Sequence, residues 1–219
     1  MSVWVKICAN TSLEDAMLAV DAGADAVGFV FAPSPRRVTA EQVAAIVPGL
    51  PKSIERIGVF VDEDAEAIAS AVLACGLTGA QLISDAGPEA PAILRARIGH
   101  GLRILRVVHF GADAAKQAEA FAADANVDAV LVDSRTATAV GGTGIAFDWD
   151  KAQTMLFGAG AMRLVAAGGL NPENVAEAIK TLKPWGVDVA SGVEAAPAKK
   201  DPVKVRDFVM RARKAAAVD

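Results

Sequence analysis

Two side chains that can carry protons, Cys8 and Asp133, each stand at the end of an apolar run. Cys8 closes the segment at residues 3–8, and Asp133 follows the run at residues 129–132. Runs of this kind are typical of buried strands, so we expect a thiol and a carboxyl at the ends of two strands. Such groups suit general acid–base catalysis. The structural alternatives are a cysteine packed as a small apolar residue and an aspartate that caps a loop or helix.

Glycine-bearing segments follow three neighbouring expected strands. They are Gly142-Thr143-Gly144, Gly168-Gly169 and Ser191-Gly192. Backbone N–H groups in such segments can approach an anion such as phosphate. One glycine pair is more often a tight turn, whereas three together indicate a phosphate cradle. A carboxyl beside that cradle indicates acid chemistry on a phosphorylated small molecule.

The elements that would position these groups alternate along the chain. Strand-like runs recur at intervals of 23 to 34 residues, at residues 3–8, 26–31, 56–61, 80–83, 103–109, 129–133, 163–167 and 187–191. Alanine-rich helical segments lie between them, at residues 13–22, 40–47, 65–74, 112–123, 174–182 and 203–216. Two helix starts have the spacing of a capping box, Ser12 with Asp15 and Thr39 with Gln42.

This alternation predicts a (β/α)8 TIM barrel, an α/β fold, in a single domain that covers residues 1–219. A doubly wound open sheet is the alternative. In a barrel the C-terminal ends of the strands meet at one face, so Cys8, Asp133 and the glycine segments should surround one site. Lys6 shares strand parity with Cys8. It should therefore point into the barrel, pair with Asp188 on the closing strand, and favour a Cys8 thiolate.

Composition excludes several classes of function. Of the 219 residues, 53% are hydrophobic and 22% charged, with a net charge of −4, so no nucleic-acid or anionic-membrane partner is indicated. Cys8 and Cys75 have no CxxC spacing, which argues against a zinc site or a disulfide framework; Cys75 is expected to be structural. No signal-peptide pattern and no apolar run of about 20 residues is present, so we expect a cytoplasmic protein.

The order of the motifs resembles the phosphoribosylanthranilate isomerase family over nearly the whole chain. Each motif alone is weak, but their joint order is specific. The matching segments include Val5-Lys6-Ile7-Cys8, Ser34-Pro35-Arg36, Asp133-Ser134, Gly141-Gly142-Thr143-Gly144, Phe147-Asp148-Trp149, Ala167-Gly168-Gly169-Leu170, Ser191-Gly192-Val193-Glu194 and Lys200-Asp201.

The resemblance implies an Amadori rearrangement of N-(5′-phosphoribosyl)anthranilate, with no metal and no redox cofactor. It implies that Cys8 is the general base, that Asp133 is the general acid, and that Arg36 holds the anthranilate carboxylate. The glycine segments correspond to the phosphate cradle. The expected partner is a small phosphorylated substrate, and the chain is expected to be a monomer or a homodimer.

The sequence departs from the family pattern after the fourth expected strand. The family's Gln-Leu-His-Gly reads Gln81-Leu82-Ile83-Ser84 here, and Ala9 replaces a glycine after Cys8. His109, one strand away, is a candidate to take the place of the missing histidine. The departure leaves open a barrel that binds a phosphorylated ligand without efficient isomerisation. A thiamin-phosphate synthase or a pentose-phosphate epimerase on a similar barrel is a further alternative.

Overall fold

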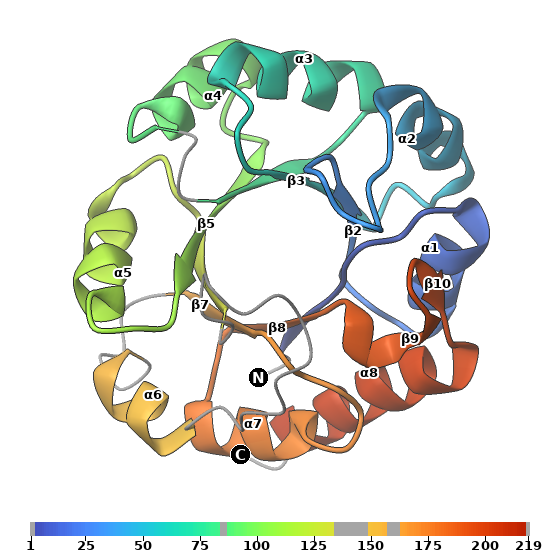
Figure 1. The fold of residues 1–219 in the computed structure, drawn as a ribbon, viewed down its shortest axis with the longest axis vertical. Coiled ribbons are helices and arrows are strands. Elements are labelled where there is room, and N and C mark those ends of the chain that lie inside the picture. Colours follow the sequence, from blue (N-terminus) through green and yellow to red (C-terminus); the bar gives the residue numbers. More distant parts are fainter. Residues whose placement is uncertain (1–2, 84–86, 134–148, 157–162, 218–219) are drawn as a thin grey trace.

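The computed structural model describes residues 3–83, 87–133, 149–156 and 163–217. Within this part of the chain, parallel strands β1 to β8 close into a barrel in sequence order. Figure 1 shows the ring of strands surrounded by helices. The predicted (β/α)8 barrel is confirmed, and the alternative of an open doubly wound sheet is wrong because β1 pairs with both β2 and β8.

The strands fall within one or two residues of the expected runs. They are β1 (Trp4–Ile7), β2 (Ala26–Val30), β3 (Glu55–Phe60), β4 (Gly79–Leu82), β5 (Arg103–His109), β6 (Ala129–Asp133), β7 (Leu164–Ala167) and β8 (Gly186–Val189). The helices are α1 (Leu13–Asp21), α2 (Ala40–Ile46), α3 (Ala65–Cys75), α4 (Ala90–Ile98), α5 (Ala114–Ala123), α6 (Trp149–Met155), α7 (Val175–Leu182) and α8 (Pro202–Ala216).

Three features were not placed from the sequence. Helix α4 has little separation of apolar and polar faces, which is the signal that reveals a helix. After β8 the chain forms a 3₁₀ turn (Ser191–Val193) and then an antiparallel hairpin of β9 (Glu194–Ala196) and β10 (Lys199–Lys200). None of the described helices is both long and apolar enough to span a bilayer.

The two expected capping boxes differ in outcome. Thr39 and Gln42 form the complete reciprocal box at the start of α2. At α1, the Ser12 hydroxyl accepts the Asp15 N–H at 3.1 Å. The Asp15 carboxylate instead accepts a hydrogen bond from the backbone N–H of Lys200 at 3.2 Å. Asp15 therefore ties the hairpin to α1 as well as lying in its first turn.

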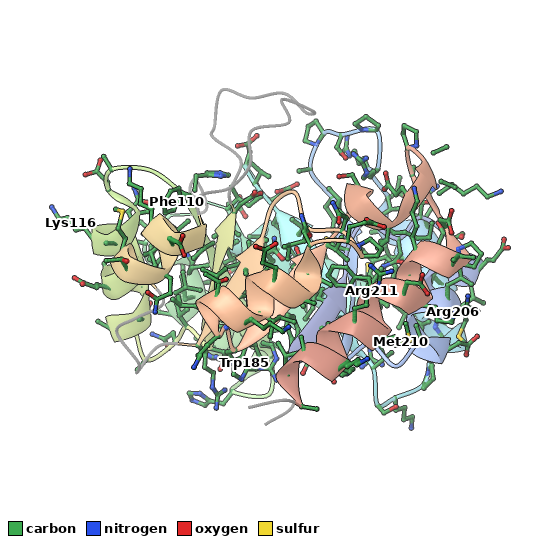
Figure 2. All side chains as sticks on the ribbon, turned by 90° about the horizontal axis from the view of Figure 1, so that it is seen from below. Phe110, Lys116, Trp185, Arg206, Met210 and Arg211 are labelled. Atoms are coloured by element: carbon green, nitrogen blue, oxygen red, sulfur yellow. The ribbon has the colours of Figure 1, made fainter. Side chains whose placement is uncertain are left out.

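The barrel is packed at one end and open at the other. Trp4 and Trp185 stack with their ring centroids 5.2 Å apart, and the Arg103 and Arg163 guanidinium groups lie over the Trp185 ring. Figure 2 shows Trp185 at the lower end of the molecule and Phe110, which follows β5, toward the upper end. The aromatic stack fills the N-terminal end of the barrel, which leaves the C-terminal end for a site, as the fold requires.

Candidate active site

A cavity of about 210 Å³ opens at the C-terminal ends of the strands. Its wall includes the predicted site residues Cys8, Arg36, Asp133, Gly168, Gly169, Ser191 and Gly192. Gly142, Thr143 and Gly144, also predicted, lie outside the described residues. Strands β7 and β8 separate β6 from β1, so the thiol and the carboxyl approach one cavity from different parts of its wall.

A second, more open hollow of about 350 Å³ is lined by residues that follow β3 and by residues in and just before α4, none of which lines the first cavity. Its acidic lining consists of Asp62, Glu63, Asp64, Glu66 and Glu89. Such a wall repels phosphates and carboxylates, so it does not suit an anionic ligand. Among the described residues, no group of three His, Cys, Asp or Glu side chains is placed to hold a metal ion.

The Cys8 thiol lies directly after β1 and is only 6% exposed. Its backbone N–H donates to the Val189 carbonyl at 2.7 Å, which links the residue to β8. A Cβ atom on Gly28 would lie 2.7 Å from the Cys8 Sγ. The neighbouring strand therefore needs a glycine at this position, because any side chain there would displace the sulfur.

Lys6, two residues before Cys8, is fully buried inside the barrel. Its Nζ donates to Asp188 Oδ1 and to Gln81 Oε1, each at 2.9 Å. The predicted ion pair with Asp188 is confirmed, and the β1–β8 register explains it because these two residues are direct partners. Gln81 was recognised only as part of a motif. Its contact with Lys6 joins positions 75 residues apart in the chain.

The electrostatics of this network act on the thiol in both directions. Burial raises the pKa of the Cys8 thiol above its ordinary value, and Asp188 acts the same way, while Lys6 and Lys200 oppose the shift. For Lys6, burial acts to lower the pKa, but attraction to Asp188 and Cys8 outweighs it and the pKa is raised. Lys6 therefore favours the thiolate, as expected, but burial has the larger effect and the Cys8 pKa is raised overall. Lys6 limits the rise in the Cys8 pKa but does not reverse it.

Asp133 ends β6 and is 6% exposed, with its carboxyl on the cavity wall. It is in register with His109 on β5 and with Ala167 on β7. His109 is not one of the residues on the described cavity wall. The described contacts therefore give no support for a substitute role of His109. Ile83 does line the cavity, so its wall is apolar where the family has a histidine.

Ala9 shows why the family carries a glycine after the cysteine. Its φ angle is +63°, in the left-handed region that side chains rarely adopt. Keeping a non-glycine residue there costs about 1–2 kcal/mol. The chain accepts this strain where it turns from Cys8 toward α1, beside the cavity.

Arg36 lies in the loop after β2, where its backbone N–H donates to the Ser34 hydroxyl at 3.0 Å. Its guanidinium donates two hydrogen bonds to the Glu194 carboxylate, from Nε to Oε1 at 2.7 Å and from Nη2 to Oε2 at 2.6 Å. Glu194 begins β9, on the hairpin that the sequence pattern did not reveal. Beside it lies the fully buried Lys200. Neither Glu194 nor Lys200 was predicted as a site residue; the only signal was their place in the family motifs.

The glycine segments after β7 and β8 lie against one another. Gly168 and Gly169 have φ angles of +84° and +70°, a conformation that favours glycine. A Cβ atom at Gly192 would overlap the Leu170 carbonyl oxygen. Two segments predicted separately thus form one part of the cavity wall, in the place where barrels of this kind usually bind phosphate.

Comparisons with known proteins agree with this geometry. The family model described as N-(5′phosphoribosyl)anthranilate (PRA) isomerase matches residues 5–211. A protein of that name from Pelobacter propionicus is 46% identical over 211 residues, covering 95% of each chain. The crystal structure of the Thermotoga maritima enzyme is 36% identical with a TM-score of 0.81, covering 97% of this chain and 99% of the other.

A further solved isomerase contains reduced 1-(o-carboxyphenylamino)-1-deoxyribulose 5-phosphate. It is 34% identical with a TM-score of 0.78, again covering 97% of this chain and 99% of that one. Similarity of this extent, together with the family model, establishes the relationship. The chain belongs to the N-(5′-phosphoribosyl)anthranilate isomerase family.

Proposed function

We propose that the protein converts N-(5′-phosphoribosyl)anthranilate into 1-(2-carboxyphenylamino)-1-deoxy-D-ribulose 5-phosphate. The observation that carries the proposal is the single cavity, which Cys8, Asp133 and Arg36 reach together with the glycine segments after β7 and β8. Each part of the substrate has a matching group in that cavity. The family relationship supports the same reaction.

Asp133 acts as the general acid in the first step. Its carboxyl gives a proton to the ring oxygen of the ribose while the bond from that oxygen to C1′ breaks. The lone pair of the anthranilate nitrogen moves in to form the C=N bond, so the ring opens to a positively charged iminium and the added proton stays on the former ring oxygen as a hydroxyl. Asp133 lies on the cavity wall, within reach of a bound sugar.

Cys8 acts as the general base in the second step. Its thiolate takes the C2′ proton, which the adjacent iminium has made acidic, and the electrons form an enol-amine. Tautomerisation of that species yields the ketone product. Because burial raises the pKa of the Cys8 thiol, the activity should increase with pH until the thiolate predominates. Lys6 favours the charged form and keeps that pH within reach.

Two groups of residues hold the ends of the substrate in this proposal. Arg36 binds the anthranilate carboxylate, because a planar guanidinium suits a planar anion. The glycine segments bind the phosphate through backbone N–H groups. Val30, Val59 and Ile83 line the cavity beside Cys8 and supply apolar contacts for the aromatic ring.

The test is a fluorescence assay that follows loss of the anthranilate substrate in the presence of purified protein. Cys8→Ala and Asp133→Ala should each lower kcat by at least about a hundredfold, the usual scale for a general acid or base. Cys75→Ala is the matched control, because Cys75 ends helix α3, outside the cavity wall, and its thiol donates to the carbonyl of Ala40 in helix α2. Near-normal turnover by either active-site variant would refute the assignment.

The alternative of an inactive phosphate-binding barrel is not supported. Relatives up to 46% identical over nearly their whole length are isomerases, and both proton-carrying side chains share the cavity. The proposal also treats residues 1–219 as one domain of a cytoplasmic enzyme that is a monomer or a homodimer and binds no nucleic acid. Light scattering after size-exclusion chromatography decides between the two oligomeric states.

A further inference from the structure

The guanidinium proposed to bind the substrate carboxylate already binds a carboxylate of the protein. Glu194 is 5% exposed and accepts two hydrogen bonds from Arg36. These two hydrogen bonds fix the plane of the guanidinium before a ligand binds. The Glu194 carboxylate also cancels the charge of Arg36, since a neutral Arg–Glu pair attracts an anion only weakly. A second cation is needed if the pair is to bind a carboxylate.

Lys200 is placed to be that cation. Its side chain is fully buried, with Nζ 3.0 Å from the Ala190 carbonyl and 3.5 Å from Glu194 Oε1. Ala190 is itself part of the cavity wall. Burial lowers the pKa of Lys200, and attraction to Glu194, Cys8 and Asp15 opposes the shift. Its acidic neighbours therefore offset part of the cost of burying the ammonium.

Lys200 is held rigidly by the hairpin. It is the register partner of Glu194 across β9 and β10, and its backbone N–H donates to Asp15 on α1. Figure 1 shows the hairpin beside α1. The Lys204 ammonium donates to the Glu194 carbonyl at 2.9 Å and adds a third cation to the cluster. Arg36, Lys200 and Lys204 against Glu194 and Asp15 sum to one positive charge.

We propose that Glu194 and Lys200 are positioning residues for the carboxylate of the substrate. Glu194 orients the Arg36 guanidinium, and Lys200 leaves the cluster with the positive charge that the orienting carboxylate would otherwise cancel. A buried ammonium is costly, and an apolar residue of similar length would fill the same volume. The charge, rather than the packing, explains a lysine here. The inference rests on the proposed function, in which Arg36 contacts the anthranilate carboxylate.

The experiment compares two ligands on the same proteins by calorimetry. One is reduced 1-(o-carboxyphenylamino)-1-deoxyribulose 5-phosphate, and the other is the same compound with phenyl in place of carboxyphenyl. The ratio of their affinities measures recognition of the carboxylate alone. Lys200→Met should lower this ratio about tenfold. The matched control is Lys199→Met, which removes the same charge from the exposed neighbouring residue and should leave the ratio unchanged.

The double variant Glu194→Gln/Lys200→Met separates charge from structure. It restores a net positive charge on Arg36, so its ratio should return to within about threefold of wild type. The inference would be overturned if Lys200→Met weakened the binding of both ligands by the same factor. It would also be overturned if the affinity ratio of the double variant were lower than that of Lys200→Met. Should Lys200→Met not fold, Lys200→Gln replaces it with the same expectation, because its amide can still donate to the Ala190 carbonyl.

The same measurements separate this inference from the proposed function. A wild-type protein that binds the carboxylated ligand but does not turn over substrate contradicts the isomerase assignment alone. An active wild type whose affinity ratio is the same in Lys200→Met contradicts only the role of Lys200.

Discussion

Removing the charge of Lys6 should shift the pH dependence of the enzyme to higher pH. Lys6 is the main group that lowers the pKa of the Cys8 thiol against burial. Two unit charges about 4 Å apart attract by about 4 kcal/mol at an effective dielectric constant near 20, equivalent to about 3 pKa units. Water in the cavity weakens this attraction. We therefore expect Lys6→Met to raise the thiol pKa by at least about one unit, which lowers the thiolate fraction at pH 7 about tenfold.

The sign of the effect follows from the role of the thiol. The base form of Cys8 is the thiolate, so kcat/KM rises as pH rises through the thiol pKa. A higher pKa moves that rise to higher pH. Rates measured from about pH 6 upward, well past an ordinary thiol pKa near 8.5, reveal the shift. The pH dependence of alkylation by iodoacetamide, measured in a Cys75→Ala background, reports the thiol directly.

A second variant removes the complication of an unpaired acid. Lys6→Met leaves Asp188 buried without its ion pair, which can cost about 3–5 kcal/mol of stability. Lys6→Met/Asp188→Asn avoids this cost. Because Lys6 acts on the thiol more strongly than Asp188 does, the double variant should still show a raised pKa. The same midpoint in wild type and in the double variant, by both kinetics and alkylation, would refute the electrostatic role of Lys6.

Two further substitutions test other parts of the site. Arg36→Ala should act mainly on KM, because the guanidinium binds the substrate in the ground state as well as in the transition state. The neighbouring exposed Arg37 supplies the control variant, Arg37→Ala. A loss confined to kcat in Arg36→Ala would contradict this role of Arg36. Ala9→Gly should leave the free energy of unfolding unchanged within about 0.5 kcal/mol, since relief of about 1–2 kcal/mol of left-handed strain offsets the lost methyl and the added chain entropy. Ala16→Gly, in helix α1 and fully buried, should cost about 2 kcal/mol by urea denaturation. An equal loss at both alanines would show that Ala9 is unstrained.

The order of the strands and the residues at their ends could be predicted from the sequence. Apolar runs separated by helical segments leave few ways to bury both faces of each strand. In a parallel barrel, the C-terminal ends of the strands lie at one face whatever the details of packing. That rule places Cys8 and Asp133 near one cavity although 125 residues separate them. The Lys6–Asp188 pair followed from strand parity and from the closure of β8 on β1.

Only the tertiary structure decided the electrostatic state of the site. The direction of the Cys8 pKa shift depends on a balance between burial and the charges of Lys6, Lys200 and Asp188. A sequence pattern indicates that a residue is buried, but it does not give the distances that set this balance. The contact of Arg36 with Glu194 joins residues 158 positions apart through a hairpin too short to be recognised from its pattern. Sequence periodicity determines which residues face the cavity. Distances in three dimensions determine which charges those residues meet there, because Coulomb interactions depend on separation and on the surrounding medium rather than on order along the chain.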